Sequence, residues 1–304
     1  MKNITLSALA LAVSAGSAFA ADLPSRKAAP VYAPPPPMWT GFYAGLNAGG
    51  TFGNNSAPNT TTWNVYRDPS NADYASAALL SGSGFNNGSG GFIGGGQIGY
   101  NWQIPFGGAG FVSGIEADIQ GIAGSGSTGS RVTAASPDDF GTPVNLLSIQ
   151  QGKANLQYIG TVRGRLGYLV MPTLLVYGTG GLAYGGVSVN MTNFQSWVEM
   201  DGRDRSAVIA GNGSYANTQV GWTVGGGLEW MFLQNWSAKV EYLYYDLGRV
   251  SGSFVNTWSG LGANAGNSDV ESVTNFSARA SGNIVRAGVN YHFNWGAAPV
   301  VAKY

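Results

Sequence analysis

The segment LQYIGTVRGRLGY, Leu156–Tyr168, alternates between two kinds of side chain along its length. Its apolar parity runs from Leu156 through Val162 to Tyr168, with glycine at two of the intervening positions. Its polar parity carries Arg163 and Arg165. Because successive side chains of a β-strand point to opposite faces, this period of two predicts a strand with one apolar and one polar face.

Seven further segments carry the same alternation, and the chain beyond Trp39 shows no helical period. Each segment supplies the roughly 9–11 residues that a tilted strand needs to cross a membrane. Together with Leu156–Tyr168 they predict eight strands. The seven segments are Gly41–Gly53, Phe92–Gln103, Ala109–Gly121, Leu174–Val189, Gln219–Trp230, Asn235–Tyr245 and Asn283–Phe293.

The composition favours a membrane protein without transmembrane helices. Only 10% of the 304 residues are charged, whereas 44% are hydrophobic, so the apolar faces cannot all be hidden behind a charged surface. No window beyond residue 20 approaches the 18 or more apolar residues of a membrane helix. In lipid every backbone polar group needs an internal partner, so strands can cross a membrane only as a closed barrel.

The polar faces of the predicted strands carry four acids and four bases. A soluble barrel would place such charges outside, whereas here they would line the interior. Eight strands leave a lumen that side chains just fill, and unpaired charges there would be costly. We therefore expect a neutral salt-bridge network that plugs the barrel; an ion or substrate channel is the alternative. The expected members are Glu116, Asp118, Arg163, Arg165, Glu229, Lys239, Glu241 and Arg286.

The connections between the predicted strands alternate in length. Short turns on one side and long loops on the other are typical of an outer-membrane barrel, and they place both termini on the periplasmic side. The short connections are Ile104–Gly108, Met171–Thr173 and Leu233–Gln234. The long ones, expected to be extracellular loops rich in Ser, Thr, Asn and Gly, are Asn54–Gly91, Ile122–Asn155, Asn190–Thr218 and Val250–Gly282.

Aromatic residues on the outward parity gather at both ends of the strands, as the two interfaces of a membrane require. The predicted belt at the short-turn side holds Phe42, Trp102, Phe111, Tyr168, Trp230, Trp236 and Phe293. The predicted belt at the long-loop side holds Tyr158, Tyr184, Trp222 and Tyr244.

The two ends of the chain are predicted to lie outside the barrel. Residues 1–20 combine Lys2, a short apolar run and the small-x-small site ending at Ala20, which predicts a signal peptide cleaved after Ala20. Residues 21–38 hold four consecutive prolines and predict a stiff periplasmic linker. The barrel is expected over residues 39–293, followed by a tail over residues 294–304.

Several motifs resemble the small outer-membrane proteins of alphaproteobacteria, the "porin family" surface antigens, which are similar in architecture to the OmpA transmembrane barrel. The resemblance spans about residues 39–293 and implies the barrel fold, but no single activity. No peptidoglycan-binding domain follows the barrel, so the resemblance does not extend to wall tethering. The motifs are WTGFYAG from Trp39, GYNWQ from Gly99, VRGRLGY from Val162, TGGLAY from Thr179 and VEYLYYDLG from Val240.

The last strand resembles the C-terminal targeting signal that the barrel-assembly machinery reads in this class of protein. The resemblance rests on Arg286, Gly288, Tyr291 and Phe293, a polar residue and a glycine followed by alternating aromatics. The chain departs from that pattern in continuing beyond Phe293 to Tyr304.

Motifs for cofactors and catalysis fit poorly. Gly94, Gly96 and Gly99 match the spacing of the dinucleotide-binding motif. That motif functions only between a strand and a helix, whereas these glycines lie within a single predicted strand. A lipid-modifying enzyme would need His292, the single histidine, as a base beside a serine, yet His292 falls at the periplasmic rim. The chain has no cysteine. We expect no cofactor, no metal site and no catalysis.

The sequence thus predicts an all-β protein, an eight-stranded antiparallel up-and-down transmembrane barrel in the cell outer membrane. Its expected role is structural, contributing to envelope integrity and surface interactions. The alternatives are a narrow porin-like channel and an outer-membrane lipid-modifying enzyme. Expected partners are membrane lipid and lipopolysaccharide, the barrel-assembly machinery and extracellular ligands of the loops, whereas the zero net charge gives no indication of nucleic acid.

Overall fold

The computed structural model describes residues 39–53, 59–64, 90–106, 109–124, 127–136, 138–139, 142–200, 202, 205–262 and 265–293. All of them belong to one compact unit, Pro37–Tyr304. The signal peptide and linker predicted for residues 1–38 and the tail predicted for residues 294–304 lie outside the described residues.

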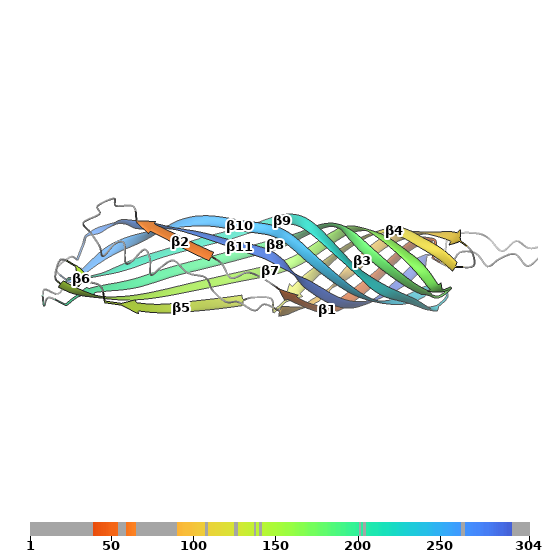
Figure 1. Ribbon diagram of the computed structural model, residues 1–304, viewed down its shortest axis with the longest axis horizontal. Coiled ribbons are helices and arrows are strands. Elements are labelled where there is room, and N and C mark those ends of the chain that lie inside the picture. The colour runs from red at the N-terminus through yellow and green to blue at the C-terminus, as the bar shows by residue number, and fades with distance from the viewer. Residues whose placement is uncertain are drawn as a thin grey trace, which may run out of the picture. The chain divides into compact units, whose positions relative to one another are not determined.

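These residues form eleven strands (Figure 1). None of the described residues forms a helix long and apolar enough to span a membrane. The strands are β1 (Gly41–Gly53), β2 (Asn59–Asn64), β3 (Gly90–Phe106), β4 (Ala109–Ala123), β5 (Ser127–Ala135), β6 (Asp138–Asp139), β7 (Thr142–Met171), β8 (Leu174–Glu199), β9 (Arg205–Leu233), β10 (Trp236–Gly262) and β11 (Ser268–Phe293).

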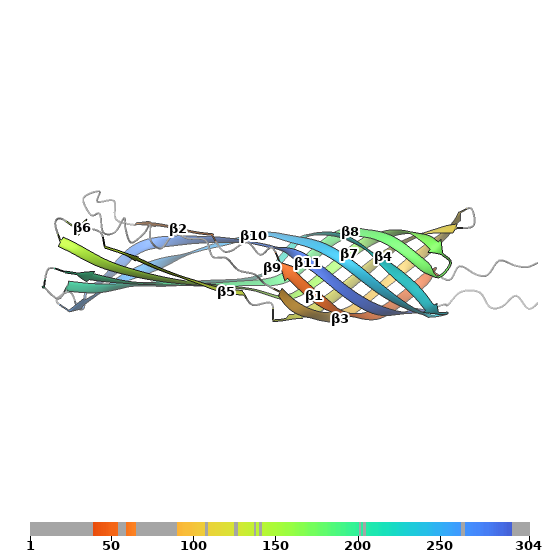
Figure 2. The same cartoon turned by 60° about the horizontal axis from the view of Figure 1, so that its bottom comes forward.

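Antiparallel pairing closes the main strands into a ring (Figure 2). The order is β1, β3, β4, β7, β8, β9, β10 and β11, and β11 pairs in turn with β1. The closing register runs from Phe42 opposite Phe293 to Gly53 opposite Gly282. A closed antiparallel ring leaves no sheet edge, as the alternating sequence predicts.

The predicted count of eight strands differs from the eleven observed because three short ones lie off this ring. Strand β5 pairs with β7, β2 pairs with β11, and the two-residue β6 pairs with the start of β7. All three fall within segments predicted as loops. Both figures show them at the end of the ring opposite β1, β3 and β4.

The predicted long loops were wrong in extent, because β7 to β11 continue through them. These strands have 26 to 30 residues, against 13 to 17 for β1, β3 and β4. In β8 the alternation in burial persists past the predicted end, with Met191 and Asn193 inward and Phe194 outward. Apolar and polar residues share each face there, so the hydropathy pattern disappears although the strand does not. Five strands therefore extend beyond the closed ring as a longer sheet, flanked by β5 and β2.

The outward parity agrees with the sequence prediction over most of the ring. Val162 and Leu166 are exposed, and the belt rings of Phe111 and Tyr168 lie 5.4 Å apart, as do those of Trp222 and Tyr244. Leu156 is an exception: it was predicted to face outward but is buried. A register shift between Leu156 and Ile159 reverses the faces at that point.

Strands β1 and β11 pack so closely where they pair that a side chain added at Gly49 would disturb the closure of the ring. A Cβ there would lie 2.1 Å from the Val285 carbonyl oxygen and 2.6 Å from the Arg286 Cα, both backbone atoms. Gly121, by contrast, has no atom within 4 Å of its added Cβ. We expect Gly49→Val to cost about 3 kcal/mol or more and to reduce the folded fraction, measured by the heat-modifiable gel shift, whereas Gly121→Val folds normally. Equal folding of the two variants would contradict the observed closure.

Candidate functional site

The interior of the ring holds a cluster of buried charges, which we call the lumen network. Its members come from five strands: β4, β7, β9, β10 and β11. The side chains are nearly inaccessible, and the four acids balance the four bases. The structure thus brings together the complete set predicted from the sequence, namely Glu116, Asp118, Arg163, Arg165, Glu229, Lys239, Glu241 and Arg286.

Arg163 lies at the centre of the lumen network. Its Nη2 lies 2.5 Å from Glu116 Oε1 and 2.8 Å from Asp118 Oδ2. Its Nη1 lies 3.0 Å from Glu241 Oε1, and its Nε donates to the Thr161 hydroxyl at 2.8 Å. One guanidinium therefore joins β4, β7 and β10 across the lumen, and the planar group suits several carboxylates at once.

Two further cations complete this half of the lumen network. Arg286 Nε donates to Glu241 Oε2 at 2.8 Å, and Arg286 Nη2 donates to Asp118 Oδ2 at 2.9 Å. Lys239 Nζ lies 2.8 Å from both oxygens of Glu116. Each of these three carboxylates contacts at least two cations, so none is left as an isolated buried charge.

The second half of the network is the pair Arg165–Glu229. Arg165 Nη2 lies 2.5 Å from Glu229 Oε2, and its guanidinium lies 4.1 Å from the centroid of the Tyr177 ring. Arg165 Nη1 also donates to the Tyr43 hydroxyl at 3.0 Å, and that hydroxyl donates to Glu116 Oε2 at 2.7 Å. Tyr43 thus connects the two halves.

Sequence reasoning missed the neutral members that satisfy the charges. Tyr43 and Tyr177 both donate to carboxylates of the network, and Asn290 donates to Glu229 Oε1 at 2.8 Å. The signal was available for both tyrosines. Phe42 and Tyr184 were placed in the outward-facing belts. Tyr43 and Tyr177 lie at odd spacings from them on the same strands, so both had to face inward.

A layer of buried, mostly apolar residues lies at the end of the lumen near the short turns. The fully buried Trp39 donates from Nε1 to the Pro172 carbonyl at 2.9 Å, and its ring lies 5.8 Å from that of His292 in an edge-to-face arrangement. The cluster at this end consists of Trp39, Val112, Leu169, Leu175, Tyr177 and Met231.

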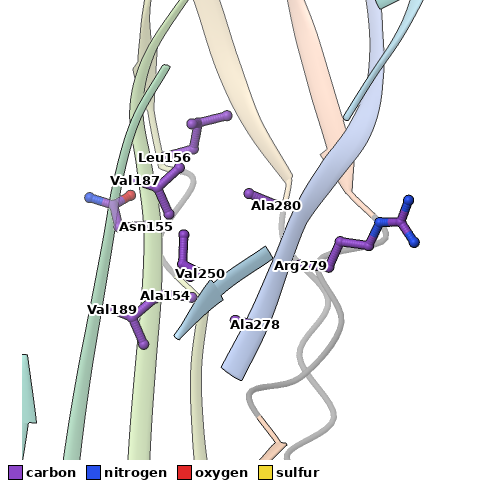
Figure 3. Close-up of a pocket in the computed structure, with 9 residues that line it drawn as sticks. All are labelled: Ala154, Asn155, Leu156, Val187, Val189, Val250, Ala278, Arg279 and Ala280. Carbon is purple, nitrogen blue, oxygen red and sulfur yellow. The ribbon is translucent and has the colours of Figure 1, made fainter. Parts of the chain in front are cut away.

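A second, larger apolar layer lies beyond the lumen network, where β1, β3 and β4 end. Ile93, Ile159 and Leu243 are fully buried in it. A cavity of about 20 Å³ adjoins it, with Ala278 and Ala280 among its lining residues (Figure 3). Such a volume holds about one water molecule. Its lining is mostly apolar, with Asn155 and Arg279 as the polar members. Apolar constrictions oppose the passage of water and ions.

The geometry does contain a serine beside the single histidine. The Ser237 hydroxyl lies 2.9 Å from His292 Nε2, but it donates its proton to Glu229 Oε1 at 2.6 Å. In this arrangement Glu229, and not His292, accepts the serine hydrogen. Both side chains are buried beneath the Trp39 layer, out of reach of a substrate. Among the described residues no group of acids and histidines could hold a metal ion.

The residues of the predicted assembly signal lie on both faces of β11. Arg286 belongs to the lumen network, whereas the rings of Tyr291 and Phe293 lie 5.1 Å apart at the strand end. A Cβ on Gly288 would lie 3.0 Å from the Leu46 carbonyl oxygen, so this position favours glycine for packing alone.

Comparison with known proteins gives a consistent result. A family model described as the outer membrane protein beta-barrel domain matches residues 6–293. The chain is 37% identical over 298 residues to the 31 kDa outer-membrane immunogenic protein of Brucella melitensis, covering 96% of this chain and 100% of that protein. It is 32% identical over 154 residues to the 22 kDa outer membrane protein of Rhizobium leguminosarum bv. viciae, covering 50% and 52%.

Among solved structures, Neisserial surface protein A is similar at 14% identity, with a TM-score of 0.26, over 84% of this chain and 98% of that one. The strand pairing, and not this weak likeness, establishes the fold. The two curated relatives confirm the resemblance to alphaproteobacterial outer-membrane proteins and place the protein in the outer membrane.

The lumen network predicts a large cost for removing its central cation. In Arg163→Ala three buried carboxylates lose a partner, and we expect unfolding in urea from lipid vesicles to show a loss of about 3–5 kcal/mol. The same change at the exposed Arg131 of β5 serves as control, with an expected effect within about 0.5 kcal/mol. A similar small loss in both variants would show that the network does not stabilise the barrel.

Proposed function

We propose that this chain, which belongs to the outer membrane protein beta-barrel domain family, is a sealed structural barrel that presents a surface sheet. In this proposal the eight strands of the ring cross the outer membrane, and β2, β5, β6 and the outer parts of β7 to β11 project from it. The protein then contributes to envelope integrity and surface interactions, and it carries out no catalysis.

The layered interior is the observation that carries this proposal. The neutral lumen network fills the middle of the ring, and apolar layers lie on both sides of it. Passing a hydrated ion would require separating buried ion pairs and wetting two apolar layers. A scaffold needs only a buried interior whose charges are balanced, and the lumen network supplies this, although Arg165 Nε and Arg286 Nη1 have no hydrogen-bond partner among the described residues.

The orientation follows from the turns and the aromatic belts. Outer-membrane barrels have short periplasmic turns and longer extracellular segments. The turns at Pro172–Thr173 and Gln234–Asn235 therefore face the periplasm, and the projecting sheet faces outward. The predicted assembly signal then ends at the periplasmic rim, where the barrel-assembly machinery would read it during biogenesis.

The two alternatives find less support. A narrow channel would need a continuous polar path, which the apolar layer around Ile159 and Leu243 interrupts. A lipid-modifying enzyme would need an accessible nucleophile, whereas Ser237 is fully buried and hydrogen-bonded to Glu229.

Single-channel recording on the refolded barrel in a planar bilayer tests the proposal. We expect no conductance steps from protein whose folding has been verified by β-rich circular dichroism, whereas a 16-stranded porin inserted in the same way supplies the positive control. Stable, reproducible steps would overturn the sealed barrel, and charge-reversing variants of the network would then show whether it lines the path.

A second test addresses catalysis. We expect purified protein incubated with outer-membrane lipid to release no product, and His292→Ala to leave the lipid profile in mass spectrometry unchanged. Turnover by the parent protein that His292→Ala abolishes would establish the enzyme in place of the scaffold.

A further inference from the structure

The outward face of β10, β11 and β2 carries two aligned rows of small polar side chains. In one row Ser251 lies opposite Ser277, which lies opposite Asn59. In the next row Ser253, Asn275 and Thr61 are aligned in the same way. These six residues line a shallow hollow of about 380 Å³. We call the surface formed by these two rows the polar ladder.

An apolar row with one aromatic residue bounds the polar ladder on the side away from the ring. Trp63 lies opposite Val273, which lies opposite Val255, and Trp63 is 50% exposed. An indole face of this kind can stack on the C–H face of a sugar ring, while its edge stays in water.

A basic row bounds the polar ladder on the side towards the ring. Arg249 and Arg279 lie directly opposite each other on β10 and β11, an arrangement in which like charges repel. Arg279, 54% exposed, pairs with Asp246, and its hydrogen bonds lower the pKa of that carboxyl. Within the described part of the chain Arg249 has no such acid. The pair thus leaves one positive charge that favours an anionic ligand.

The distance of the polar ladder from the aromatic belt indicates which molecules surround it. Asn283 lies opposite the belt residue Tyr244. Arg279 precedes Asn283 by four residues on β11, about 14 Å along the strand, and Val273 precedes it by ten residues, about 34 Å. In the proposed orientation the basic row lies just beyond the lipid boundary, and the rows of hydroxyls and amides lie further out.

We propose that the polar ladder binds the phosphorylated core saccharide of lipopolysaccharide in the surrounding outer leaflet. Hydroxyl and amide groups both donate and accept hydrogen bonds, as sugar hydroxyls do. The rows repeat at the inter-strand spacing of about 4.8 Å, close to the length of one sugar ring. Protein interfaces, by contrast, are depleted in serine. This inference rests on the orientation given under Proposed function.

Binding of purified lipopolysaccharide to the full-length mature barrel in detergent tests the inference. The probes are rough lipopolysaccharide, which keeps its core sugars, lipid A alone, the soluble core oligosaccharide and neutral maltohexaose. We expect Trp63→Ala and Asn275→Ala each to weaken binding of rough lipopolysaccharide by roughly five- to ten-fold, with lipid A binding unchanged. Arg249→Gln is expected to weaken both, since its charge lies nearest the phosphates.

Matched controls come from another outward face of the same sheet. Phe194→Ala on β8 and Lys153→Gln on β7 remove an exposed aromatic ring and an exposed cation, and both should bind like the parent protein. All variants must retain the heat-modifiable gel shift.

Three results would overturn the inference. Parent-like affinity of Trp63→Ala and Asn275→Ala for rough lipopolysaccharide would remove the saccharide site. Equal loss of lipid A binding in these two variants would show that the sugars are not what is recognised. Competition by maltohexaose as strong as that by the core oligosaccharide would assign the ladder to free glycans. A conducting barrel would contradict the proposed sealed scaffold, but the binding assay would still test the polar ladder, because it does not depend on conductance.

Discussion

The ion pairs that Arg163 makes with Glu116, Asp118 and Glu241 hold three strands together across the lumen, and the rest of the interior is arranged around them. A buried guanidinium is tolerated only when its charge and its N–H groups are satisfied, so the acids on β4 and β10 require the bases on β7 and β11. Tyr43 and Tyr177 donate further hydrogen bonds to these acids. An interior built in this way is the basis for the proposal that the barrel is sealed.

The same chain uses its strands for two purposes along their length. Near the turns the outward face is apolar and aromatic, which suits lipid, and the inward face is charged. Further along, β7, β8 and β9 stay paired, as do β10 and β11, whereas β9 and β10 separate after Asp246 and pair again from Thr257. The outward face there mixes Ser, Thr and Asn with exposed apolar residues. Strands, and not loops, therefore carry the surface residues well beyond the ring, whereas flexible loops would have to order themselves on binding at an entropic cost.

The ring and its charges could be predicted from the sequence because lipid imposes a strict period of two. Gly41–Gly53 was predicted with the bounds that β1 has, and the eight charges were assigned by parity alone. The extensions escaped prediction because Met191 and Asn193 share one face, which removes the hydropathy contrast. Leu156 was misplaced because a bulge leaves no mark in composition. The polar ladder could not be found, since the alignment of Asn59 with Ser277 depends on the pairing of strands distant in sequence.

Osmotic water permeability tests whether the lumen is sealed. Stopped-flow light scattering would compare liposomes that contain the folded barrel with protein-free liposomes of the same size and lipid composition. A filled lumen between two apolar layers predicts the same shrinkage rate in both. Faster shrinkage with a low activation energy in the barrel-containing liposomes would show a continuous water path and contradict the account.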